Sequence, residues 1–247
     1  MPPKITNRVG ETSKNAYSSV MKITKYNTIN DIEVTFDNGF VTHSYYDDFK
    51  KGSISNPLDK TCCNIGYFGV GKYDSKNKAY SIWRGIIERC YDEKSLKKYT
   101  TYIGCSVCDE WHNYQNFAKW FENNYYEIKG QEMHIDKDIL FKENKIYSPE
   151  TCVFVPKEIN VLFVRNNKRR GIYPIGVYLS INGERYVAHC YNKKPTYLGT
   201  YDTPEEAFEA YKDYKEDVIK GIADKYYGLI PDKLYKAMYD YVVEITD

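Results

Sequence analysis

The first 58 residues alternate between apolar and polar positions. In "SSVMKITKY" and "IEVTFDNGFVTHSY" the apolar side chains return at every second residue, which is the period of a half-buried strand. Asp37-Asn38-Gly39 interrupts the second run, and an Asn-Gly pair tolerates the positive φ angles of a tight hairpin turn. The pattern predicts a small antiparallel, barrel-like β-domain over residues 1–58.

The middle of the chain changes to a helical period. Residues 59–78 are rich in glycine and predict a linker. In "AYSIWRGIIERCY" the apolar side chains fall three and four residues apart, and "NYQNFAKWFENNYYEI" repeats this spacing from Asn113 onward. Two amphipathic helices are therefore expected between residues 79 and 130.

The last part of the chain, residues 171–247, combines strands and helices. "GVYLSINGERYVAHCYNKKPTYLGTYDT" predicts three short strands, with Asn182-Gly183 in the first turn and "NKKP" in the second. A long helix should start at Pro204, because Thr203 can cap it and Glu206 can complete a capping box. A shorter helix should follow Pro231. The predicted fold class is α+β.

Composition narrows the range of functions. The 247 residues include 42% hydrophobic side chains, enough for two or three cores, and the net charge is +1. No stretch of about 18 apolar residues is present, so no membrane span is expected. The first residues lack the apolar region of a secretory signal, and the seven cysteines are scattered. These features favour a reducing, cytoplasmic setting.

Charge is distributed unevenly towards the C-terminus. Residues 160–198 carry seven Lys or Arg and one acid, whereas residues 199–247 carry six Lys or Arg and twelve acids. A basic sheet with exposed aromatic side chains suits a nucleic-acid groove, so double-stranded DNA is the expected partner. The basic residues are Arg165, Lys168, Arg169, Arg170, Arg185, Lys193 and Lys194, and the aromatic ones are Tyr178, Tyr186 and Tyr191.

The segment "GVYLSINGERYVAHCYNKKPTYLGTYDTPEEAFEAYKDY" resembles an AP2-type DNA-binding domain. That family has three antiparallel strands followed by a helix, and "YLGTYDTPEEAFEAY" stands in the place of its signature. The resemblance implies that the sheet enters the major groove and that Tyr178, Arg185, Tyr186 and Lys193 contact DNA. The first strand, "YLSIN", has few of the basic and Trp residues usual in the family.

Three earlier segments resemble phage-type HNH endonucleases, which often carry an AP2-type domain behind the nuclease. These are "IWRGIIERCYDE", "IGCSVCDEWHNYQNFAKWF" and "HIDKDILFKENKIYSPETCVFVPKEIN". The resemblance implies an HNH-like ββα-metal core with flanking helices over residues 79–165. It also implies hydrolysis of DNA phosphodiesters with Mg²⁺ or another divalent cation. For a phage-encoded chain, the setting would be the host cell cytoplasm.

The resemblance also assigns roles to individual residues. Asp136 occupies the family's metal-binding Asp, and Asn160 the last ligand position on the helix. The family's general-base His follows that Asp directly, where this chain has Lys137. His134 lies two residues before Asp136, on the same strand face, and is expected to act as metal ligand or base. Lys137 should point to the other face of the strand. A further role expected for Lys137 is to stabilise charge on the phosphate.

A few alternatives stay open. Asn144 or Thr151 takes the position of the Asn that orients the catalytic His. With Lys137 in the place of that His, the chain could be an inactive DNA-binding regulator or a phage inhibitor of host defence on the same scaffold. An adaptor that binds proteins through its 27 tyrosines is a third class. The sequence gives no oligomeric state.

The cysteines allow one more metal site. Cys105 and Cys108 have the spacing of a zinc knuckle, and Cys90, Cys152 and His112 could complete it. A second pair with this spacing is missing, and Cys90 falls on the apolar face of its predicted helix. Structural zinc is therefore not expected.

Overall fold

A computed structural model of the chain describes residues 7–164, 172–192 and 194–245. The fold is mixed α+β, as predicted. The chain divides into two compact units, one made of Met1–Asn123 with Lys145–Pro149 and the other of Asn124–Asn144 with Glu150–Asp247. Each unit is described by itself below.

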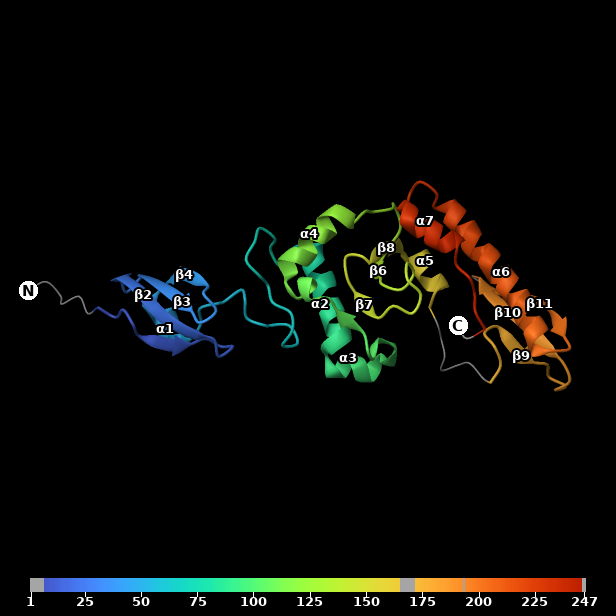
Figure 1. The fold of residues 1–247 in the computed structure, drawn as a ribbon, viewed down its shortest axis with the longest axis horizontal. Coiled ribbons are helices and arrows are strands. Elements are labelled where there is room, and N and C mark those ends of the chain that lie inside the picture. Colours follow the sequence, from blue (N-terminus) through green and yellow to red (C-terminus); the bar gives the residue numbers. More distant parts are fainter. Residues whose placement is uncertain (1–6, 165–171, 193, 246–247) are drawn as a thin grey trace, which may run out of the picture. The chain divides into compact units, whose positions relative to one another are not determined.

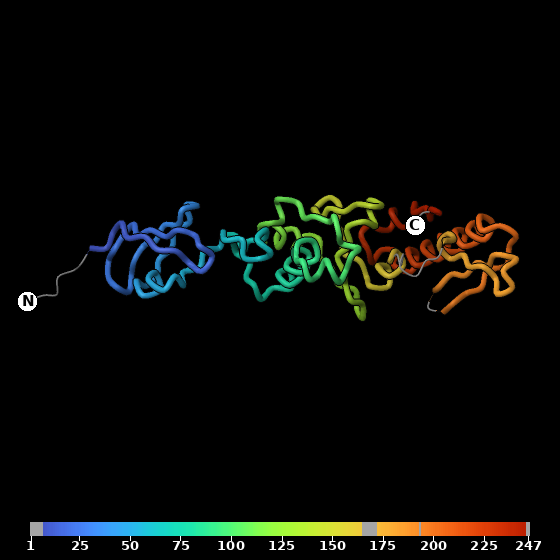
Figure 2. The backbone as a smooth tube through the Cα atoms, turned by 90° about the horizontal axis from the view of Figure 1, so that it is seen from below, coloured from blue at the N-terminus to red at the C-terminus, as the bar shows by residue number. Residues whose placement is uncertain are grey.

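The first unit begins with an antiparallel four-stranded sheet (Figures 1 and 2, blue). Its elements are β1 (Thr12–Lys14), β2 (Val20–Thr28), β3 (Asp31–Phe36), β4 (Val41–Ser44) and α1 (Tyr46–Lys51). The strands pair in chain order, and no pairing of β1 with β4 is seen in the described part of the chain. The predicted hairpin is confirmed, since Gly39 between β3 and β4 has φ +86°. Met21, Ile23, Val34 and Phe49 form the core.

The predicted linker, residues 59–78, packs against the helices that follow. The Tyr67 amide donates a hydrogen bond of 2.8 Å to the His112 carbonyl. Gly69 has φ +76°, and a Cβ there would lie 1.9 Å from Oδ1 of Asn113. A side chain at this position would therefore separate the segment from the helix that begins beside it.

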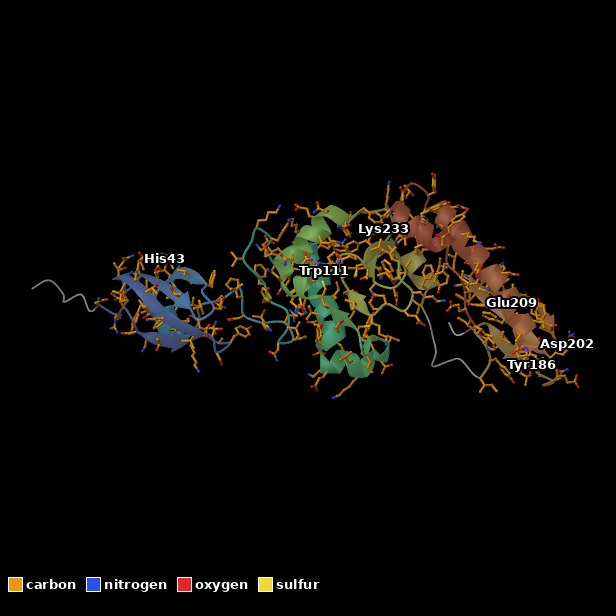
Figure 3. The ribbon with its side chains drawn as sticks, in the orientation of Figure 1. His43, Trp111, Tyr186, Asp202, Glu209 and Lys233 are labelled. Atoms are coloured by element: carbon orange, nitrogen blue, oxygen red, sulfur yellow. The ribbon has the colours of Figure 1, made fainter. Side chains whose placement is uncertain are left out.

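The rest of the first unit is helical with short strands. It contains α2 (Lys78–Tyr91), α3 (Glu93–Lys98), η1 (Thr100–Tyr102), β5 (Ser106–Val107), η2 (Asp109–His112), α4 (Tyr114–Asn124) and β7 (Ile146–Tyr147), which pairs with β5. The two predicted helices are α2 and α4. Nε1 of Trp83 donates a 2.7 Å hydrogen bond to the carbonyl of Trp111, which lies buried among the aromatic side chains of α2 and α4 (Figure 3).

The second unit contains two layered regions that share helix α6. Its elements are β6 (Met133–Asp136), β8 (Val153–Pro156), α5 (Lys157–Leu162), β9 (Val177–Leu179), β10 (Tyr186–Asn192), β11 (Lys194–Tyr201), α6 (Pro204–Lys225) and α7 (Asp232–Tyr239). The C-terminal half of α6 packs with α7, β8 and α5 around Ile219 and Leu234. Its N-terminal half covers one face of the sheet β11-β10-β9 (Figure 1).

The start of α6 follows the predicted capping pattern. The Thr203 side chain accepts a hydrogen bond from the Glu206 amide, and the Glu206 carboxylate accepts one from the Thr203 amide. This reciprocal pair satisfies two backbone donors that a helix start otherwise leaves open. The three-stranded sheet followed by a helix that starts at Pro204 is confirmed, whereas Asn192, Lys194 and Pro195 of the predicted second turn belong to the paired strands β10 and β11.

Candidate functional site

The segment with the predicted nuclease residues forms a strand, a strand and a helix. β6 and β8 pair antiparallel, with Met133 opposite Pro156 and Asp136 opposite Val153. Helix α5 follows β8 directly and contacts both strands (Figure 1). The three elements form an antiparallel strand pair followed by a helix that contacts both strands.

His134 and Asp136 lie on the helix-covered face of this strand pair. His134 stands opposite Val155 and Asp136 opposite Val153. Directly opposed residues share one face of a sheet. Both valines belong to the core that includes Ile159 of α5. The imidazole and the carboxylate therefore project from one strand towards the helix that carries Asn160.

The Asp136 carboxylate is held by the turn that follows β6. Its Oδ1 accepts hydrogen bonds of 2.8 Å from the amides of Asp138 and Ile139. The pKa of Asp136 is raised to about 6, mainly by burial and next by the nearby Asp138 carboxylate, while the two amides act in the opposite direction. A bound cation would relieve both unfavourable effects.

His134 has a neighbour that the sequence did not reveal. Its Nε2 is buried and lacks a well-aligned hydrogen-bond partner among the described residues, although Oε1 of Glu132 lies 3.4 Å away. The other carboxylate oxygen of Glu132 is 3.0 Å from Nζ of Lys157, at the start of α5. Lys157 and then His134 lower the pKa of Glu132, so this residue presents an anion to the imidazole.

Lys137 is tied to the loop after β6. Its side chain is buried, and Nζ donates hydrogen bonds to the carbonyl of Asn144 at 3.0 Å and to Asp138 at 3.1 Å. Nδ2 of Asn144 donates in return to the Lys137 carbonyl at 2.7 Å. The predicted orienting residue Asn144 thus holds the loop through Lys137.

The donor set fits a hard divalent cation only in part. Asp136 offers a carboxylate, His134 an imidazole and Asn160, half-buried on α5, an amide oxygen. Mg²⁺ usually keeps several waters and binds one or two carboxylates, so a small set of protein ligands is sufficient. Within the described ranges, however, three or more His, Cys, Asp or Glu side chains do not gather at any one point. This finding covers the candidate zinc residues Cys90, Cys105, Cys108, Cys152 and His112 as well.

The second candidate surface is the outer face of the sheet β11-β10-β9. Val177, Ala188 and Cys190 point inward to α6 and are buried. The alternate positions point outward and carry aromatic rings, with the Tyr178 and His189 ring centroids 6.1 Å apart and those of His189 and Tyr197 5.6 Å apart. We call Tyr178, His189 and Tyr197 the aromatic row. Next to it, an open groove of about 630 Å³ is lined by Tyr178, Ile181 and Val187, among others.

The predicted DNA-binding residues fall into distinct groups. Tyr178 and Tyr191 are exposed, with 57% and 72% of their surface accessible, and Lys194 is exposed at the start of β11. Arg185 is paired with Asp202 at 2.8 Å and also donates to the Thr200 carbonyl. Arg165, Lys168, Arg169, Arg170 and Lys193 lie outside the described residues.

Tyr186 lies on the other face of this sheet. Its ring packs against Tyr173, with centroids 5.3 Å apart, and joins the core beneath α6, near the same sheet end as Asp202 (Figure 3). The position next to it, Val187, faces outward together with His189. Strand alternation through "YVAHCYN" places His189 on the outward face, although His189 is not among the predicted DNA-binding residues.

Comparisons with known proteins give no further identification. No family model, no curated protein and no solved structure matches the chain. Across the ranges that the structure describes, no helix is both long and apolar enough to cross a membrane.

Proposed function

We propose that the protein is a DNA-binding, metal-dependent hydrolase of DNA phosphodiesters. The observation that carries this proposal is the position of His134 and Asp136, which project from one strand onto the face covered by α5. The resemblance to phage-type HNH endonucleases supports it independently of the geometry. The basic residues of 160–198 and the C-terminal sheet would hold the DNA.

The cation would be held by Asp136, His134 or both, with Asn160 as a further oxygen ligand. Such an ion neutralises the scissile phosphate and stabilises the leaving oxygen. In the arrangement with His134 as base, its Nδ1 takes a proton from a water whose oxygen attacks phosphorus. The bond from phosphorus to the leaving oxygen then breaks, that oxygen takes a proton from solvent water, and the His134 imidazolium returns its proton to solvent.

Neighbouring residues would position these groups. Glu132 lies beside Nε2 of His134, which leaves Nδ1 for the water. Lys137 and Asn144 fix the loop whose amides hold Asp136. In this arrangement Lys137 acts on the shape of the site, because its ammonium group already has two oxygen partners.

The second candidate function is DNA binding without cleavage, as in a regulator or an inhibitor of host defence. Two observations favour it. Lys137 stands where the HNH family has its base, and its side chain is buried. Moreover, in the described part of the chain no three His, Cys, Asp or Glu side chains are arranged so that they could hold one metal ion together.

A plasmid-nicking assay with Mg²⁺ or Mn²⁺ separates the two functions. We expect the wild type to nick supercoiled DNA and the Asp136→Asn variant to lose this activity while still binding DNA. Asp109→Asn, which neutralises a fully exposed carboxylate, is the matched control and should nick at the wild-type rate. Undiminished nicking by Asp136→Asn would refute the site, and DNA binding without nicking in either metal would establish the second function.

A further inference from the structure

The aromatic row on the C-terminal sheet has a composition unlike that of a surface that reads duplex DNA. Base edges in the major groove are read mainly by forked donors such as Arg, Asn and Gln. On this sheet the guanidinium group of Arg185 is held at the edge by Asp202 and Thr200. The outward positions between the strand ends present the rings of Tyr178, His189 and Tyr197 instead.

Exposure of these rings sets them apart from most aromatic residues of the chain. Tyr178 and Tyr197 expose 57% and 62% of their surface, and Tyr191 at the end of β10 exposes 72%. Aromatic rings normally contribute most when they are covered, because their burial removes a large apolar area from water. A row of uncovered rings on a rigid sheet is therefore a surface that a partner can cover.

Charge around the row favours a polyanionic partner. Strands β9, β10 and β11 contain no acidic residue among their described positions, and Lys194 is the first residue of β11. Residues 160–198 as a whole carry seven Lys or Arg against one acid. Exposed rings on strands without an acidic residue, with Lys194 beside them, match a strand of nucleic acid, whose bases have flat faces and whose backbone is negative.

We propose that the aromatic row binds unpaired nucleotides, whose bases stack on Tyr178, His189 and Tyr197. Only unpaired or splayed bases offer their faces, since the faces of duplex bases are covered by their neighbours. The open groove beside Tyr178 adds apolar surface from Ile181 and Val187 for such a base. This inference rests on the proposed function for its nucleic-acid partner and deepens it, because the substrate would be DNA with a single-stranded segment.

The test compares the affinity of the full-length protein for three fluorescent 20-nucleotide probes: single-stranded DNA, the matched duplex, and RNA of the same sequence. We expect single-stranded DNA to bind at least about tenfold more tightly than the duplex. Stacking is worth about 1–3 kcal/mol per base, so Tyr178→Ala or Tyr197→Ala should weaken single-strand binding about 5- to 150-fold. Tyr178→Phe should retain it, because the ring remains.

Tyr227→Ala is the matched control. Tyr227 is 72% exposed in the turn after α6, away from the sheet strands, and its replacement should leave the affinity for single-stranded DNA within about twofold. A base analogue such as 2-aminopurine in the probe should be quenched by the wild type and less by Tyr178→Ala. Thermal melting of each variant separates a lost contact from a lost fold.

The outcomes distinguish the inference from the proposed function. Equal affinity for duplex and single strand, with no loss in folded Tyr178→Ala and Tyr197→Ala, would overturn the stacking role even if nicking persists. Tighter binding of RNA than of DNA would overturn the DNA substrate and keep stacking. Single-strand binding without nicking would uphold the stacking role while the hydrolase proposal fails.

Discussion

The β6-β8-α5 segment and the outer face of the C-terminal sheet differ in the exposure of their candidate functional side chains. In the first, Asp136 and His134 are turned towards the protein's own core, and burial disfavours the carboxylate charge. In the second, Tyr178 and Tyr197 are turned outward and leave most of their surface uncovered. An ion needs a small number of fixed donors shielded from bulk water, whereas a polymer needs an open, rigid surface.

The comparison predicts that chemistry and binding can be lost separately. His134→Ala should reduce nicking by about 10²- to 10⁴-fold, the usual contribution of a general base, and leave DNA affinity within about twofold. Tyr178→Ala should have the opposite effect, with weaker single-strand binding and nicking that recovers at saturating DNA. A gel-based rate measured over a DNA titration checks both, and equal loss of binding in the two variants would remove the distinction.

The next largest effect is on the stability of the C-terminal sheet, whose inner face packs against α6. Phe208 of α6 is buried beneath the sheet at 4% exposure. Phe208→Ala should cost about 3–5 kcal/mol of unfolding free energy because it leaves a cavity. Urea denaturation measures this, with Tyr227→Ala as the exposed control at about 1.5 kcal/mol or less, because it removes only a ring contact with Tyr235. A loss below 1 kcal/mol for Phe208→Ala would show that the sheet does not depend on this packing.

The buried carboxylate of Asp136 should lower the free energy of unfolding at neutral pH. Its folded-state pKa is raised from the usual 3.8 to about 6, so the folded protein binds the proton more tightly than the unfolded chain does. The Asp136 carboxyl group therefore lowers the free energy of unfolding as pH rises from about 4 to 6. Above pH 6, where the group is ionised in the folded protein, the full loss of stability applies. At pH 7.5 without metal, Asp136→Asn should therefore stabilise the protein by about 1–2 kcal/mol, within the limit of about 3 kcal/mol that the pKa sets.

Denaturation at two pH values checks this sign. The gain from Asp136→Asn should be present at pH 7.5 and nearly absent at pH 4. Asp109→Asn, at an exposed position, should give no such difference. A destabilised Asp136→Asn variant at pH 7.5 would contradict the inferred burial of the charge.

Glu132 is expected to have a smaller effect on catalysis than His134. It lies beside Nε2 of the imidazole, and in the proposed site it would orient His134. Residues of this kind typically change activity by about 10- to 100-fold. Glu132→Gln should lower the nicking rate about tenfold at unchanged DNA affinity, and Glu132→Asp should recover part of the loss. If Glu132→Gln nicks DNA at the wild-type rate, Glu132 does not orient His134, and its role is limited to the ion pair with Lys157.

The smallest predicted effect is at Arg185. Its ion pair with Asp202 is exposed, with 48% and 80% of the side chains accessible. Such pairs contribute about 0–1 kcal/mol, so Arg185→Ala should change stability by less than about 1 kcal/mol. Single-strand affinity should fall no more than about threefold at physiological salt, because the guanidinium group is occupied by Asp202. A tenfold loss would show that Arg185 leaves Asp202 to bind nucleic acid.

Local patterns were sufficient to predict much of the fold. The hairpin at Gly39 and the capping box at Thr203 and Glu206 depend on residues close in sequence, and both are confirmed. The packing of residues 59–78 was not predicted. It depends on a close approach between Gly69 and Asn113, which are 44 positions apart in a sequence that shows only a run of glycines.

The sequence predicted that His134 and Asp136 share one strand face, but it did not predict which residues pack around them. Period two placed His134 and Asp136 on one face, and the strand register agrees. Asp136 stands opposite Val153, which belongs to a core that α6 and α7 complete from the far end of the chain. The position of Glu132 beside His134 depends on its ion pair with Lys157. Tyr186 points towards the core because its ring packs against Tyr173.

The most direct test of the central claim is the effect of Mn²⁺ on the imidazole NMR signals of the four histidines. A paramagnetic ion held by His134 and Asp136 should broaden the His134 signals at substoichiometric Mn²⁺, before those of His43, His112 and His189. Asp136→Asn should abolish this selectivity. If all four histidines broaden together, or if His134 broadens equally in Asp136→Asn, the cation site on β6 is contradicted.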